Sequence, residues 1–401
     1  MHGKFVNVFL VFLIALTAGA ASNCFCQDHF EINGRVIERT STSVLPYAHI
    51  GIKNSSIGTV SNELGLFKLI VPNSLKPDTL VVSYLGYKTY LVPISALEKS
   101  CDIYLDEQPL VLKDVVIDAK RLSAEDLLYK AVENLLQNAS YPTADFKLEG
   151  FYREVQRTDK KTVFLVESAF NIYDDVTTHP LAAIEIKEFR KILNQVPLPD
   201  MKMYNHNNLL RLFDISTNFV VLAKHGLKAG KTTWAIGNRP YEIADVSVYN
   251  GKEVYVIIHD NDHVSLKVIV DANNFSVLRN EYHSKQAPQD FNNYFWKYRR
   301  GNLRCGFYET HQVYEYREFK GKLYPYFFYR NDCSKCFDSN GTVQNESLGK
   351  YQALISKIEL GQKSPERLKH LKKHKGMQDM DFKYNAEFWK RYNIIRDLPQ
   401  E

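Results

Sequence analysis

The chain lacks the motifs that most directly identify a function. Its 401 residues contain no His-Glu-x-x-His, Gly-x-Ser-x-Gly or Gly-x-Gly-x-x-Gly pattern, which argues against the common zinc proteases, α/β-hydrolases and dinucleotide-binding enzymes. Beyond residue 26, no apolar run approaches the ~20 residues that a membrane-spanning helix needs. The excess of 51 basic over 46 acidic side chains is small for so long a chain. We therefore expect a protein that is not an enzyme, needs no cofactor or metal and binds no nucleic acid.

Aromatic residues, in contrast, are plentiful. The chain has 25 Tyr, 23 Phe and 3 Trp, and such residues favour the pleated, half-buried surface of a sheet. At ~100–200 residues per domain, the length predicts two or three domains. The composition thus favours a mainly β, multidomain protein.

The first 26 residues have the features of a signal peptide. Lys4 is the only charge before a continuous apolar stretch from Val8 to Leu16, and small residues follow. Cleavage is plausible after Ala18-Gly19-Ala20 or after Cys24-Phe25-Cys26. Acylation of Cys24 is the alternative, although Ser22-Asn23 fits a lipoprotein signal poorly. We expect secretion across an inner membrane, and a periplasmic or outer-membrane-associated product.

Residues 28–107 contain short β-type runs separated by turns. The runs are FEINGRVI, AHIGIK, SIGTV, GLFKLIV, TLVVSYL, YKTYLVPI and CDIYL. Their number and spacing predict a sandwich of about seven strands.

Several segments of this sandwich resemble a known family. They are Gly34-Arg35-Val36, Leu45-Pro46-Tyr47-Ala48, the run from Gly58 to Phe67, and Val82-Ser83-Tyr84-Leu85-Gly86-Tyr87-Lys88. These segments resemble the carboxypeptidase-regulatory-like domain, a transthyretin-like sandwich found at the N-terminus of TonB-dependent receptors and other Gram-negative envelope proteins. The resemblance implies a non-catalytic module and no peptidase activity.

Residues 108–142 are predicted to connect this sandwich to a second domain. A strand from Leu110 to Ile117 precedes a helix whose start has a capping box, Ser123 with Asp126. Apolar residues from Leu127 to Leu136 recur at helical spacing, so the helix must pack on a neighbour, and we expect it to dock the two domains together.

Residues 143–361 alternate apolar and polar side chains over long runs, which predicts one larger, curved antiparallel sheet. The segment from Leu148 to Ala169 is similar to the segment that follows the same sandwich domain in envelope proteins of unknown function. The stretch Val254–His283 is similar in pattern to the half-barrels of lipoprotein carriers. Charges such as Arg279 and Glu281 interrupt the strands, so we do not expect a transmembrane barrel.

The cysteines are the sharpest local motif. Cys333-Ser334-Lys335-Cys336 lies among Tyr-rich strands that lack the βαβ setting of a redox motif, and no second close pair completes a zinc site. In an oxidising compartment we expect a structural disulfide, either within this pair or with Cys305. Cys101 is the remaining candidate, and four cysteines allow three full pairings that the sequence does not separate.

Other candidate motifs have ordinary explanations. The run Gly226–Thr232 has only three residues between its glycines, whereas a phosphate-binding loop needs four. His259-Asp260-Asn261-Asp262-His263 lies between two strands, where it is expected to form a polar turn in place of a metal site. Asp174 and Asp175 are adjacent on a strand and point to opposite faces, so they cannot flank one substrate bond.

The C-terminal part, residues 362–401, is predicted to form a basic helix and tail. The segment SPERLKHLKKHK is expected to be a solvated helix face, with contact to anionic headgroups as the alternative. Phe388, Trp389 and Tyr392 are expected to pin the C-terminus to the sheet.

The leading hypothesis is a non-enzymatic binding or assembly module of the cell envelope with a protein partner. The first alternative is a carrier of a lipid or other apolar ligand in a half-barrel, which an open apolar cavity would support and a filled interior would exclude. The second is a hydrolase of unrecognised type, which clustered His, Asp and Glu residues in a cleft would support.

Overall fold

The structure is a computed structural model of the chain. It describes residues 29–98, 100–108, 122–136, 142–159, 161–174, 183–193, 240–285, 297–368 and 384–396. The predicted signal peptide and the strand from Leu110 to Ile117 lie outside these ranges. No helix among the described residues is long and apolar enough to cross a membrane.

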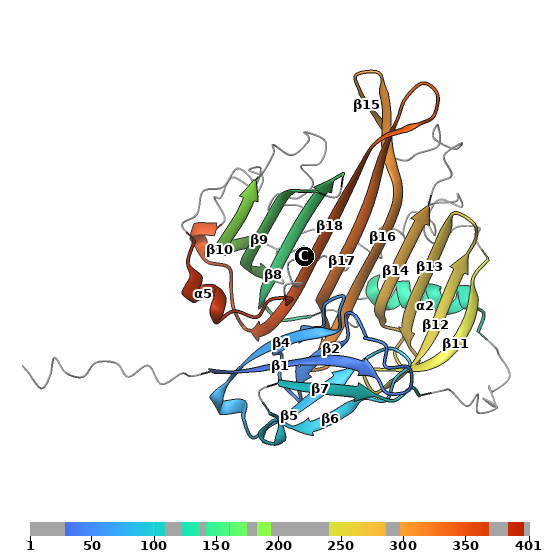
Figure 1. The fold of residues 1–401 in the computed structure, drawn as a ribbon. Coiled ribbons are helices and arrows are strands. Elements are labelled where there is room, and N and C mark those ends of the chain that lie inside the picture. The colour runs from blue at the N-terminus through green and yellow to red at the C-terminus, as the bar shows by residue number, and fades with distance from the viewer. Residues whose placement is uncertain are drawn as a thin grey trace, which may run out of the picture.

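The N-terminal part forms a sandwich of two small sheets (Figure 1). One sheet has the order β4-β1-β7, with β1 at His29–Glu38, β4 at Leu66–Pro72 and β7 at Ser100–Leu105. The other has the order β3-β2-β5-β6, with β2 at His49–Ile52, β3 at Gly58–Val60, β5 at Thr79–Ser83 and β6 at Tyr90–Pro93. Their inward side chains form one apolar core that includes Ile50, Phe67 and Val82. The seven predicted strands are confirmed.

The turn before β4 shows how the sequence folds locally. The side chain of Asn62 accepts hydrogen bonds from the backbone N–H groups of Leu64 and Leu66, at 2.9 and 3.0 Å. Gly65 has a φ of 71°, a conformation in which a Cβ is strained. An Asn and a Gly at this spacing therefore fix the turn by which the chain passes from β3 in one sheet to β4 in the other.

The second part is one antiparallel sheet of eleven strands with the order β10-β9-β8-β18-β17-β16-β14-β13-β12-β11, and β15 also pairs with β16. The strands are β8 (Phe146–Thr158), β9 (Lys161–Asp174), β10 (Ala183–Leu193), β11 (Glu242–Tyr249), β12 (Lys252–Asp260), β13 (Val264–Asp271), β14 (Val277–Lys285), β15 (Lys297–Arg300), β16 (Leu303–Phe319), β17 (Lys322–Phe337) and β18 (Val343–Leu360). In Figure 1, β16, β17 and β18 extend past their neighbours on the side away from the sandwich. The predicted larger antiparallel sheet is confirmed.

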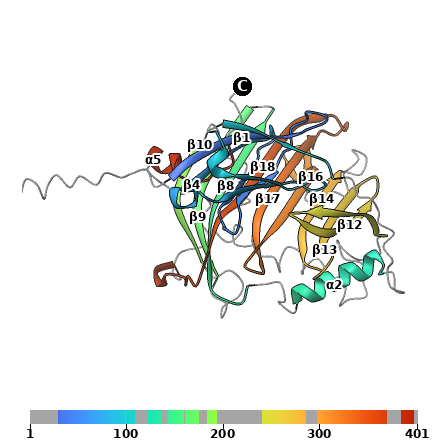
Figure 2. The ribbon, with the colours of Figure 1, turned by 90° about the horizontal axis from the view of Figure 1, so that it is seen from below.

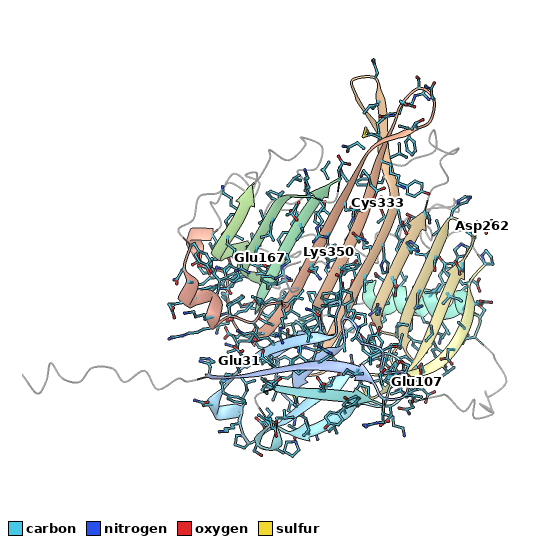
Figure 3. The ribbon with its side chains drawn as sticks, viewed as in Figure 1. Glu31, Glu107, Glu167, Asp262, Cys333 and Lys350 are labelled. Carbon is cyan, nitrogen blue, oxygen red and sulfur yellow. A yellow bond between two sulfur atoms is a disulfide. The ribbon has the colours of Figure 1, made fainter. Side chains whose placement is uncertain are left out.

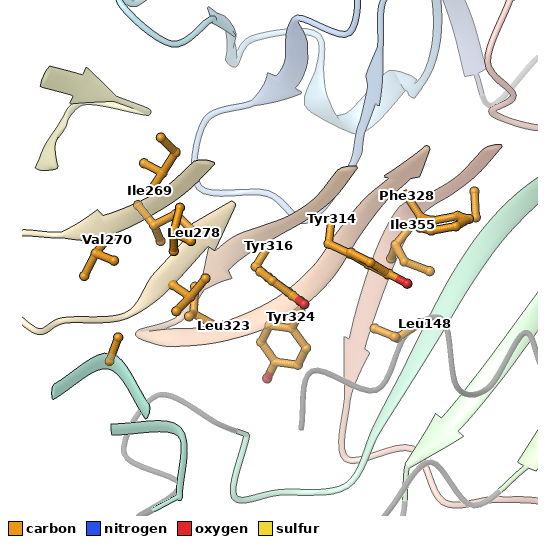
Figure 4. Close-up of a cluster of buried hydrophobic side chains, with 14 of the residues drawn as sticks. Leu148, Ile269, Val270, Leu278, Tyr314, Tyr316, Leu323, Tyr324, Phe328 and Ile355 are labelled. Carbon is orange, nitrogen blue, oxygen red and sulfur yellow. The ribbon is translucent and has the colours of Figure 1, made fainter. Parts of the chain in front are cut away.

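The two faces of this sheet bury different partners, because successive residues of a strand point to opposite sides. On the back face, Tyr152, Tyr314 and Phe328 belong to a large apolar core (Figure 4). On the front face, the residues next to them in sequence, Phe151, Val313 and Phe327, pack with Val60 of the sandwich. Figure 2 shows the helix on one side of the sheet and the sandwich strands β1 and β4 on the other.

Helix α2 (Ala124–Leu136) begins at the predicted capping box. The Asp126 N–H donates to Ser123 Oγ at 3.1 Å, and the Ser123 N–H donates to an Asp126 carboxylate oxygen at 3.0 Å. The buried helix residues, such as Leu128, join the back-face core of the large sheet. The helix therefore packs on the large sheet, and Leu85 of the sandwich packs against the same core.

The C-terminal segment covers part of the front face. It contains α5 (Ala386–Lys390), and η6 (Glu366–Leu368) precedes it. Trp389 is 5% exposed and packs edge-on against Phe151. The side chain of Asn393 both donates to the carbonyl of Ile70 and accepts from its N–H, and so satisfies the free edge of β4. The aromatic residues thus pin the C-terminus to the sheet, as expected, and Asn393 also ties it to the sandwich.

Candidate functional site

The front face of the large sheet carries a ladder of charged residues that starts at the contact with the sandwich and continues along the strands. On β14, charged or titratable side chains occur at every second position: Arg279, Glu281, His283 and Lys285. Strand β16 lies directly alongside, with His283 opposite His311 and Arg279 opposite Glu315. Because side chains alternate along a strand, all of these groups point to the front.

Two His–Glu pairs stand next to each other in this ladder. His283 Nε2 lies 2.8 Å from Glu309 Oε1, and His311 Nε2 lies 2.9 Å from Glu281 Oε1. The two imidazole centroids are 5.6 Å apart. Burial by itself would raise the pKa of Glu281, but the hydrogen bond with His311 and the charge of Arg279 lower it to about 2.

A pocket of about 350 Å³ opens beside these pairs. Its lining comes from β14, β16, β17 and β18 and consists of Lys285, Tyr308, Glu309, His311, Asn331, Cys333, Lys335, Glu346 and Leu348. Lys335 Nζ lies 3.5 Å from Glu346 and 4.1 Å from the centre of the Tyr308 ring. In Figure 3, Cys333 lies farther from the sandwich than Lys350 does along the long strands. The pocket is thus a polar site on the part of the sheet that the sandwich leaves uncovered.

The Cys-x-x-Cys motif does not pair internally. Cys336 forms a disulfide with Cys305, its direct opposite on β16, at a Cα–Cα distance of 4.0 Å. Cys333 and Cys336 are three residues apart on an extended strand, which separates their Cα atoms by ~10 Å and points the side chains to opposite faces. The pairing with Cys305 is one of the alternatives that the sequence leaves open.

The other two candidate cysteines have free thiols. Cys101 lies on β7 of the sandwich, next to the Asn33 carbonyl, and so belongs to a different sheet from the other cysteines. Cys333 faces the pocket, where burial together with the Glu346 carboxylate raises the pKa of its thiol to about 11. A thiol that stays protonated at neutral pH is a poor nucleophile.

A buried charge cluster joins the ladder to the sandwich. The imidazole of His49 on β2 pairs with Glu315, which also pairs with Arg279, and the Tyr249 hydroxyl lies 3.1 Å from His49 Nε2. Glu315 is 1% exposed. Burial would raise the pKa of Glu315, but His49 and Arg279 outweigh it and hold the pKa below its ordinary value.

Other polar and aromatic contacts fix the same interface. The Tyr326 hydroxyl donates to the Thr59 carbonyl at 2.6 Å, and Lys350 pairs with Glu63 of the sandwich. The Tyr47 ring stacks on Phe327 at 5.2 Å. The sandwich is therefore held in one orientation on the sheet, and Lys350, the partner of Glu63, stands opposite the pocket residue Asn331.

A polar turn is confirmed at Asn261–His263, whereas His259 and Asp260 are the last residues of β12. The Asn261 side chain accepts from the N–H groups of His263 and Val264 at 2.9 and 2.8 Å. His259 contacts the Pro240 carbonyl and Asn261. Within the described ranges, no group of three or more His, Cys, Asp or Glu side chains is arranged to hold a metal ion.

Several sequence candidates lie outside the described residues: the run Gly226–Thr232, Asp175, and most of the basic segment after Leu368. The pocket residues Glu309, His311, Asn331 and Glu346 were not predicted as a site. Their signal was the period-2 placement of charge on β14 and β16. Arg279 and Glu281 belong to that pattern, but by themselves they argue only against a transmembrane barrel.

Comparison with known proteins identifies the N-terminal part. Residues 32–117 match the family described as CarboxypepD_reg-like domain, so the sandwich is a domain of this non-catalytic regulatory type. No curated protein matches the chain.

Among solved structures, the chain is similar to one titled "Lipid-protein interactions in lipovitellin", with 10% identity and a TM-score of 0.25. The similarity covers 57% of this chain and 26% of the lipovitellin chain. At that TM-score it carries no argument about fold or ligand.

Proposed function

We propose that this protein is a non-enzymatic binding or assembly module of the cell envelope, and that it binds its partner at the front-face pocket. The observation that carries the proposal is the polar pocket beside a regulatory-type domain that is fixed on the same face of the sheet. The predicted signal peptide supports a periplasmic or outer-membrane location.

The charged side chains that line the pocket are held by pairing with neighbouring side chains, which favours binding. Glu309 is bonded to His283, His311 to Glu281, and Lys335 to Glu346. These pairs hold the side chains in place before any ligand arrives, and such preorganisation lowers the entropic cost of binding.

The carrier alternative finds less support. The back face, where an apolar ligand would lie in a half-barrel, is filled by its own buried side chains, and the pocket described above is polar. A hydrolase is the second candidate, because His311 lies with two carboxylates in a cleft. The protonated Cys333 thiol argues against a thiol nucleophile there.

The test is fractionation of a Gram-negative host that expresses the full chain with a C-terminal tag, followed by crosslinking and mass spectrometry. We expect recovery in the envelope and crosslinked partners that disappear with Asn331→Trp, which fills the pocket. Lys187→Trp, on an exposed residue of β10 at the edge of the sheet remote from the pocket strands, is the matched control and should keep the partners. Recovery only in the cytosol, or the same partners with both variants, would contradict the proposal.

A further inference from the structure

The pocket has the chemistry of a site for a neutral, polyhydroxylated ligand. We propose that it binds a neutral carbohydrate of one or two sugar rings, an inference that rests on the proposed function and names its ligand class. The pocket's charge balance, its position among interior strands and its mixed lining each support this assignment.

The charges of the lining cancel. Lys285 and Lys335 face Glu309 and Glu346, so the two lysines and the two carboxylates balance each other. An anionic ligand that paired with the lysines would leave the carboxylates without their partners. A cationic ligand that paired with the carboxylates would leave the lysines without theirs. Unpaired charge at a binding site costs affinity, so the site discriminates in favour of a ligand without net charge.

The strands beneath the pocket are interior strands. β16 is paired with β14 and β17, and β17 is paired with β18, so their backbone hydrogen-bonding groups are already used. An extended peptide binds a sheet mainly by adding a strand at a free edge, which this site does not offer. The ligand must therefore be recognised by side chains within a compact volume.

The lining combines hydrogen-bonding groups with a small apolar part. The amide of Asn331, the imidazole of His311 and the carboxylate of Glu309 supply both donors and acceptors, as hydroxyl groups require. Tyr308 and Leu348 supply apolar surface for the C–H face of a sugar ring. About 350 Å³ lies at the lower end of the ~300–1,000 Å³ typical of small-ligand pockets, which fits one or two rings.

Saturation-transfer NMR and calorimetry on the purified full chain test the assignment. The probes are neutral mono- and disaccharides, with a uronic acid and an amino sugar as the charged analogues. Asn331→Leu removes the amide but keeps the number of side-chain heavy atoms, and Lys187→Leu on β10 is the control on the same sheet away from the pocket. A second arm displays the neutral sugars on glycolipid vesicles, which separates free oligosaccharide from a surface-bound glycan.

We expect a neutral sugar to bind in at least one arm, with affinity lowered about tenfold or more by Asn331→Leu and unchanged by Lys187→Leu. Preferential binding of a charged analogue, absence of sugar binding in both arms, or equal binding by the two variants would overturn the inference. If sugar binding fails while Asn331→Trp still abolishes the crosslinked partners, the proposed function stands and only the ligand class is wrong.

Discussion

The buried charge cluster between sandwich and sheet should contribute strongly to stability. Glu315 is the shared partner of His49 and Arg279, and it is 1% exposed. Glu315→Gln keeps the shape of the side chain but removes its charge. The His49 imidazole and the Arg279 guanidinium then lose the carboxylate that they share. Removing one partner of a buried ion pair costs ~3–5 kcal/mol, and we expect the lower end because Arg279 keeps Glu281 at 3.2 Å.

Denaturant and thermal unfolding measure this cost. A loss of ~3 kcal/mol corresponds to a Tm lowered by roughly 6–12 °C for a cooperative unit of ~200 residues. Glu309→Gln is the matched control, since it breaks a His–Glu pair whose side chains are 38–43% exposed. Exposed pairs contribute ~0–1 kcal/mol, so the control should change stability little.

A double-mutant cycle with His49→Phe assigns the effect to the interface. We expect a coupling of roughly 1–3 kcal/mol between positions 49 and 315, because the residues are in direct contact. The pKa of Glu315 is lowered by folding, so its contribution is present above the ordinary pKa of a glutamate and is lost as pH falls through the lowered value. Equal stabilities of wild type and Glu315→Gln at pH 7, or a coupling near zero, would refute this reasoning.

Three further perturbations test other parts of the fold. Cys336→Ser removes a crosslink between residues 31 apart in sequence, and loop entropy predicts that the free energy of unfolding falls by roughly 3–4 kcal/mol in denaturant titrations. Cys333→Ser, which removes a free thiol, should change the free energy of unfolding little. Burial raises the pKa of Glu154 to about 7, so the free energy of unfolding of the wild type should fall by about 3 kcal/mol as pH rises from about 4.5 to about 7. Glu154→Gln should remove this dependence of stability on pH. The same dependence in both proteins would contradict the prediction. Gly150→Ala would place a Cβ 2.4 Å from the Phe170 ring, and we expect a lower Tm by calorimetry, with an unchanged Tm showing that the ring can move aside.

Much of the architecture could be predicted from the sequence because it depends on local patterns. The seven strands of the sandwich follow from short apolar runs and turn residues, and Ser123 with Asp126 marks the start of α2. The alternation on β12 and β13 identifies adjacent strands of one sheet, since period 2 is a property of each strand by itself. These features need no information about distant residues.

The candidate site depends on contacts between distant segments. Glu309 and His283 are 26 residues apart, and His49 and Glu315 are 266 apart. Sequence shows that charge recurs on β14, but strand order and register decide which residues stand opposite it. The apolar stripe of α2 likewise requires a partner without specifying which one, and only the structure shows that it packs on the large sheet.

The cysteines show most clearly which properties follow from the sequence and which follow from the tertiary structure. The sequence by itself determined that Cys333 and Cys336 lie on a Tyr-rich strand without the setting of a redox motif. Only the tertiary structure decided the pairing, because the antiparallel register of β16 and β17 places Cys305 opposite Cys336 and turns Cys333 to the other face. Local residue patterns specify strands, whereas the register between strands, set by packing across the whole sheet, creates the disulfide and the pocket.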